Sequence, residues 1–71
     1  MTGEEFLRRL RRLSRQRGVS MQIVYHLGKG SHVTLYFGGA KTVLKDRKKE
    51  IGTGLLHSMC RQLGIDRNDL Y

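Results

Sequence analysis

Apolar and polar residues alternate with a period of two through the middle of the chain. The segments "MQIVYHL" (Met21 to Leu27), "SHVTLYF" (Ser31 to Phe37) and "AKTVLK" (Ala40 to Lys45) follow this pattern. A period of two predicts strands that bury one face. The sequence "GKG" separates the first two segments, and Gly38-Gly39, a signal for a two-residue hairpin turn, separates the last two. We therefore expect a three-stranded antiparallel meander.

Segments with helical periodicity lie on either side of these strands. In "TGEEFLRRLRRLSRQRG", from Thr2 to Gly18, leucines and a phenylalanine share one face and arginines the opposite one. Thr2 and Glu5 have the spacing of a capping box. A second helix is expected from about Thr53, as N-cap, to Leu63. Its predicted apolar stripe comprises Leu55, Leu56, Met59, Cys60 and Leu63.

The predicted element order is α-β-β-β-α, which is an α+β fold. With 71 residues the chain is long enough for one small domain, residues 1–71, with a thin core. Two amphipathic helices suffice to cover one face of a three-stranded sheet, and the other face is expected to stay open. The charged segment 46–52 is expected to be irregular, and "IDRNDLY" a polar tail.

The lengths of the two loops, three residues in "GKG" and two in Gly38-Gly39, set the expected strand register. This register pairs Tyr25 with Val33 in the first hairpin and Val33 with Leu44 in the second, and it keeps the apolar residues on one face, which a slip of one residue would not. One residue further along, it sets His26 opposite His32 and His32 opposite Lys45. We expect these three side chains to form a row across the open face.

Charge and cysteine content narrow the classes of function. The chain has 14 lysines and arginines against 6 aspartates and glutamates, a formal net charge of +8. This excess favours a polyanionic partner, with nucleic acid first and an acidic protein as the alternative for the arginine face of the first helix. A single cysteine excludes an internal disulfide and fits a reducing cytoplasm, and no apolar run predicts a membrane span.

Two motifs resemble the HicA family of bacterial toxins, the ribonuclease half of HicA–HicB toxin–antitoxin pairs. They are "GKGSH" on the first hairpin and "EIGTGLLHSMCRQLGI" near the end of the chain. The resemblance covers about Phe6 to Ile65 and implies a fold similar to the double-stranded-RNA-binding domain. It implies that His32 is the active-site histidine, with Gly30 and Ser31 as its leading pair. The positions that match the family's last helix are Thr53, Gly54, Gln62, Gly64 and Ile65.

The resemblance also implies an activity and partners. They are metal-independent endonucleolytic cleavage of mRNA, which arrests translation, and a HicB-like antitoxin that covers the His32 surface in the bacterial cytoplasm. The sequence departs from the family at one place: Lys45 stands where the family commonly has a proline, and Arg47 where it has a second histidine. A non-catalytic RNA-binding module of the same fold is the alternative.

The chemistry of such a site needs a base for the 2′-hydroxyl of RNA and cations for the phosphate. We expect His32 to be the base and His26 the acid. Lys29, Lys45, Arg47 and Lys48 are the expected phosphate-binding cations, with Gly30 and Ser31 beside them. Scattered acids and the absence of histidine pairs with zinc-ligand spacing predict no metal and no cofactor.

Overall fold

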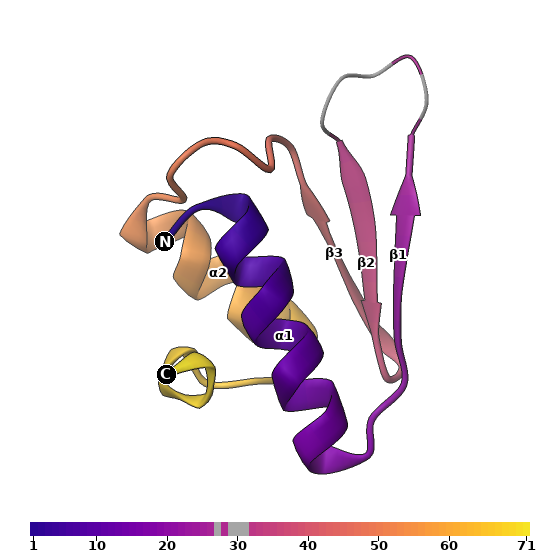
Figure 1. Ribbon diagram of the computed structural model, residues 1–71. Coiled ribbons are helices and arrows are strands. Elements are labelled where there is room, and N and C mark those ends of the chain that lie inside the picture. Colours follow the sequence, from indigo (N-terminus) through magenta and orange to yellow (C-terminus); the bar gives the residue numbers. More distant parts are fainter. Residues whose placement is uncertain (27, 29–31) are drawn as a thin grey trace.

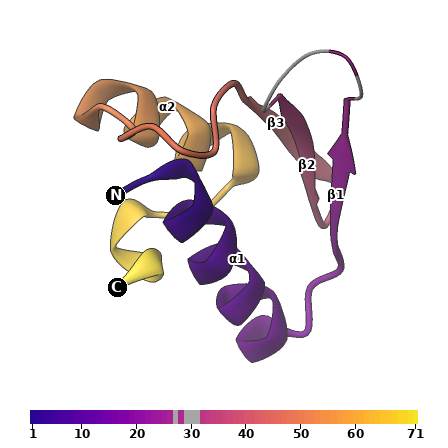
Figure 2. The ribbon, with the colours of Figure 1, turned by 45° about the horizontal axis from the view of Figure 1, so that its top comes forward.

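The computed structural model describes residues 1–26, 28 and 32–71, and its element order confirms the predicted α+β layout (Figure 1). The elements are α1 (Gly3–Arg17), β1 (Met21–Tyr25), β2 (Val33–Phe37), β3 (Ala40–Leu44), α2 (Thr53–Leu63) and a short 3-10 helix η1 (Arg67–Leu70). The strands form one antiparallel sheet in the order β1-β2-β3. Both α-helices lie on the same side of it (Figure 2).

Helix α1 begins and ends where the sequence predicts. The hydroxyl of Thr2 accepts a hydrogen bond from the Glu5 amide at 3.2 Å, which satisfies one of the unpaired donors at the helix start. Gly18 ends the helix in a left-handed conformation with φ of 64°, and its amide donates to the carbonyl of Ser14. Phe6 and Leu10 are fully buried, so the apolar face of α1 packs into the core as predicted.

The strand register confirms both predicted hairpins. Tyr25 lies opposite Val33, and Val33 lies opposite Leu44. Each strand is shorter than its alternating segment, because regular pairing ends at Tyr25 on β1 and Leu44 on β3. Val33, Leu35 and Phe37 of the central strand are buried against the helices, so the apolar alternates do share one face.

Helix α2 packs on β3 with two differences from the sequence prediction. Its N-cap is Gly52 rather than Thr53, and no side chain caps it. Leu55, expected in the apolar stripe, is 55% exposed, whereas Leu56, Met59, Cys60 and Leu63 are buried. Leu55 points away from the core because it precedes Leu56 by one position, about 100° around the helix. The hydroxyl of Thr42 donates to the side-chain carbonyl of Gln62, which ties β3 to α2.

The prediction of a polar tail after Gly64 is wrong. The last residues form the helical turn η1, with a capping box between Asp66 and Asp69, and Leu70 is fully buried. The guanidinium groups of Arg9 and Arg12 on α1 each donate to the Leu70 carbonyl oxygen at 3.1 Å. The turn therefore closes the core beneath α1, and hydrogen bonds from Arg9 and Arg12 hold it there.

Candidate functional site

The two predicted catalytic histidines lie opposite each other at one end of the sheet. The His26 amide donates to the His32 carbonyl oxygen at 3.3 Å, which extends the β1–β2 register by one pair. The imidazole Nε2 of His26 lies 2.7 Å from the Thr34 hydroxyl. His32 is two residues before Thr34, so both lie on the face away from the helices, the open face. His26 is exposed and His32 is half-buried.

Lys45 lies at the same end of the sheet, one residue beyond β3. Val33 pairs with Leu44, which is the last β2–β3 pair at this end, so His32 and Lys45 each adjoin a paired residue. Lys45 is exposed. The backbone therefore sets His26 opposite His32, as the sequence predicts, and places Lys45 at the same end of the sheet, while the pairing of Lys45 with His32 stays a prediction. We call these three residues the open-face row, which combines two imidazoles with a cation.

The loop that carries three further predicted site residues lies mostly outside the described residues. Lys29, Gly30 and Ser31 belong to this part, as does Leu27. Gly28 is described, with φ of 80°, a conformation that favours glycine.

Arg47 does not join the open-face row. Its guanidinium carbon lies 5.1 Å from the centre of the Tyr25 ring, a cation–π contact. Tyr25 alternates with His26 along β1, so its side chain is on the helix side of the sheet. Lys48 follows in the same irregular segment, is exposed, and its amide is bound by the Asp46 carboxylate at 2.9 Å.

The start of α1 determines where Arg47 lies. The amides of Gly3 and Glu4 donate to the carbonyl oxygens of Lys49 and Arg47 at 3.1 and 2.7 Å, so this segment caps the helix with its backbone. A Cβ built on Gly3 would lie only 2.7 Å from the Arg47 Cα and 2.7 Å from the Asp46 carbonyl oxygen. Only glycine allows this approach, which holds the Arg47 side chain over β1.

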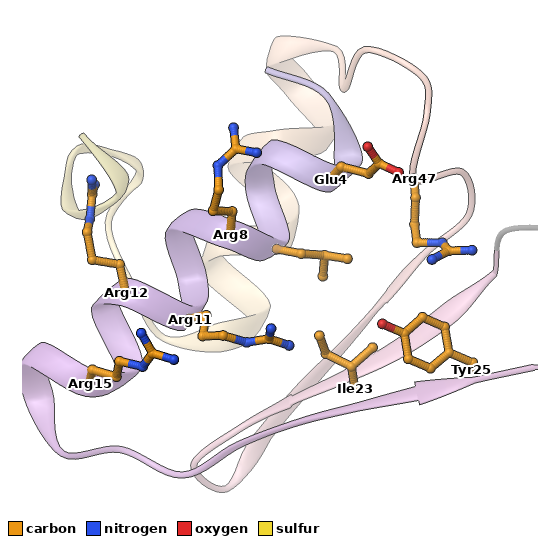
Figure 3. A pocket seen from close by; sticks show the side chains of 9 residues that line it. Glu4, Arg8, Arg11, Arg12, Arg15, Ile23, Tyr25 and Arg47 are labelled. Carbon is orange, nitrogen blue, oxygen red and sulfur yellow. The ribbon is translucent and has the colours of Figure 1, made fainter.

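A groove of about 580 Å³ runs between α1 and β1 (Figure 3). Arg11 and Arg15 reach from α1 toward β1, while Arg8 and Arg12 point away from the sheet. Ile23 and Tyr25 face it from β1, and Tyr25 is 53% exposed. Its lining residues are Glu4, Leu7, Arg8, Arg11, Arg12, Arg15, Ile23, Tyr25 and Arg47. We call it the α1–β1 groove.

The groove is electrostatically unbalanced. The ion pairs found among residues 1–26, 28 and 32–71 join Met1 with Glu50, Arg9 with Glu5, and Arg17 with Asp69. None of them involves an arginine that lines the α1–β1 groove, and the buried Nε of Arg47 has no hydrogen-bond partner in that part of the chain. The groove therefore presents positive charge beside an apolar floor.

Sequence reasoning missed this groove for two reasons. The alternation of β1 places Tyr25 on the covered face, yet its side chain is 53% exposed. Arg47 was expected among the phosphate-binding cations of the His32 site, whereas its side chain lies over Tyr25. A signal was available in Gly3, because a glycine in the first turn of an otherwise strong helix indicates a close backbone approach.

The remaining reactive groups do not form a site in the described structure. Cys60 is buried in α2, and burial raises the pKa of its thiol, which keeps it protonated and unreactive. Within the described ranges no three His, Cys, Asp or Glu side chains gather in a way that suits a metal ion. No helix in those ranges is both long and apolar enough to cross a membrane.

In comparisons with known proteins, no protein-family model, no curated protein and no solved structure matches the sequence.

Proposed function

We propose that this protein is a metal-independent endoribonuclease. The observation that carries the proposal is the open-face row, in which His26 and His32 are opposed at the end of the β1–β2 hairpin and Lys45 directly follows β3 at the same end of the sheet. Two histidines and a lysine are the groups needed to move protons and to offset charge on a phosphate.

In the proposed reaction the 2′-hydroxyl of the RNA is the nucleophile. His32 takes the proton of this hydroxyl as its oxygen attacks the adjacent phosphorus. His26 donates a proton to the oxygen that leaves, so the site gains and loses one proton in each cycle. Lys45 offsets the negative charge that grows on the phosphate oxygens. The exposure of His26 and Lys45 leaves room for a single-stranded segment to lie over the row.

The biological role that we propose is that of a HicA-type toxin, with mRNA as the substrate and arrest of translation as the result. It rests on the resemblance of the "GKGSH" and "EIGTGLLHSMCRQLGI" segments to that family. The α-β-β-β-α order agrees with a fold similar to the double-stranded-RNA-binding domain. A HicB-like antitoxin that covers the open-face row would neutralise the toxin in the bacterial cytoplasm.

A second candidate is a non-catalytic RNA-binding module. Two observations favour it: Arg47 replaces the family's second histidine, and Arg47 lies on the helix side of the sheet rather than beside His32. Such a module would bind RNA through its positive charge and leave it intact.

Measuring RNA cleavage with and without a chelator distinguishes the two candidates from each other and from a metal-dependent nuclease. We expect the purified protein to cleave a mixed-sequence single-stranded RNA equally fast with and without excess EDTA, because proton transfer by imidazole needs no metal. The measurement is the initial cleavage rate from gel-resolved products. Loss of cleavage in EDTA that magnesium restores would overturn the proposed mechanism. Intact RNA under all conditions, together with saturable RNA binding, would establish the non-catalytic module.

A further inference from the structure

Strand β1 forms an edge of the sheet that nothing in the described structure covers (Figure 1). Its sequence, Met21–Tyr25, contains no charged residue. The opposite edge strand, β3, carries the exposed Lys41 and packs against α2. Proteins protect edge strands from further pairing with charged residues or by covering them. Of the two edges, β1 is therefore the one suited to accept another strand.

The pairing pattern shows which backbone groups of β1 face outward. The Gly38 amide donates to the Ser20 carbonyl, and the His26 amide donates to the His32 carbonyl. In an antiparallel pair the hydrogen-bonded residues alternate, so the even-numbered residues from 20 to 26 bond to β2. The amides and carbonyls of Met21, Ile23 and Tyr25 point outward from the sheet. No backbone hydrogen bond from another described segment satisfies them.

The same residues face the α1–β1 groove with their side chains. Ile23 and Tyr25 form its β1 side, and the guanidinium groups of Arg11 and Arg15 reach toward them from α1 (Figure 3). Arg47 lies over Tyr25 at the end of the groove. A chain paired with β1 would therefore place every second side chain on the side where these three cations lie.

We propose that an extended, acidic segment of a partner protein binds to β1 as a fourth strand. Its backbone pairs with the outward groups of Met21, Ile23 and Tyr25. Its alternate carboxylate side chains enter the α1–β1 groove and pair with Arg11, Arg15 and Arg47. The backbone bonds supply affinity, and the charges select an acidic partner.

Two other occupants fit the groove less well. A second copy of this chain would place a second set of arginines beside the α1–β1 groove, and the two copies would repel each other because each carries a net charge of +8. RNA would satisfy the arginines, but its phosphates cannot donate to the outward carbonyl groups of β1. In addition, the Arg47 guanidinium already covers a face of the Tyr25 ring on which a base would stack.

This binding surface is separate from the open-face row, because the groove lies on the helix side of the sheet and the imidazole of His26 lies on the other. The inference does not depend on RNA cleavage, because it is tested by peptide binding instead.

The test uses the peptide SEVEVEVES-NH2 with fluorescein on its N-terminus, in which glutamates occupy alternate positions, and fluorescence anisotropy with the whole protein. A scrambled peptide of the same composition, with its glutamates in one block, is the matched charge control. Two further peptides carry three backbone N-methyl groups each, one on three consecutive glutamates of the four and the other on the three valines. In a strand that pairs along one edge, only one of these sets of amides faces β1.

We expect the alternating peptide to bind about tenfold more tightly than the scrambled one or better, because only alternation lets a strand paired with β1 place all its carboxylates on the groove side of the sheet. One N-methylated peptide should lose at least about tenfold in affinity and the other should not. Equal affinities for the alternating and scrambled peptides, or equal losses for both N-methylated ones, would overturn the proposal.

Protein variants test the groove. The double variant Arg11→Gln, Arg15→Gln should weaken binding of the alternating peptide by about tenfold or more. The control Arg61→Gln, Arg67→Gln removes the same charge from exposed positions on α2 and η1 and should change affinity little. Equal effects of the two double variants would show that only net charge matters and would overturn the proposal. Oligouridine that competes fully with the peptide and depends on Arg11 and Arg15 would identify the groove as an RNA site instead.

Discussion

Replacing His32 with alanine is expected to lower the RNA cleavage rate by about two to four orders of magnitude, the usual contribution of a positioned general base. The His32 side chain lies at the end of the sheet, just outside β2, and is half-buried, so its removal should leave the buried core untouched. RNA affinity should change little, because the positive charge of the chain supplies most of it. The measurements are single-turnover cleavage and anisotropy on the same RNA.

Two other histidines serve as comparisons. His57→Ala removes an exposed imidazole from α2 and should leave the cleavage rate unchanged. His26→Ala should remove one limb of the pH–rate profile if His26 is the acid, since two titrating groups produce a bell-shaped profile. Unchanged cleavage by a folded His32→Ala protein would contradict the proposed base, and an unchanged pH profile in His26→Ala would contradict the proposed acid.

The sheet was predictable because two independent signals agree on it. The alternation in β1, β2 and β3 determines which face of each strand is buried, the loop lengths at the glycines determine the register, and both hairpins pair as those signals require. The helices were predictable from their periodicity, with Thr2 and Gly18 marking the ends of α1. These signals are local in sequence, which is why they could be read without a structure.

Features that depend on tertiary contacts were not predictable in the same way. Leu70 follows four polar residues, and nothing local indicates that the Arg9 and Arg12 side chains bind its carbonyl. The same distinction between local signals and tertiary contacts applies to the candidate site. The register sets His26 opposite His32, whereas the direction of the Arg47 side chain depends on how residues 46–49 pack against the start of α1.

The packing of residues 46–49 against the start of α1 leads to a second prediction, on stability. Gly3→Ala is expected to destabilise the protein by about 1–3 kcal/mol, the usual cost of overfilling a packed site. The new methyl group would lie 2.7 Å from the Arg47 Cα and the Asp46 carbonyl oxygen, so backbone rather than a flexible side chain must shift. The shift would also strain the hydrogen bonds from Gly3 and Glu4 to the carbonyls of Lys49 and Arg47.

Gly54→Ala is the matched control, because Gly54 lies in the first turn of α2 as Gly3 does in α1. A Cβ on Gly54 meets no atom within 4 Å. Alanine should therefore stabilise the protein there by about 0.4–1 kcal/mol, by reducing the conformational freedom of the unfolded chain. Urea unfolding of both variants measures the difference. If Gly3→Ala stabilised the protein as much as Gly54→Ala, residues 46–49 would not pack on α1, and the placement of Arg47 over Tyr25 would be wrong.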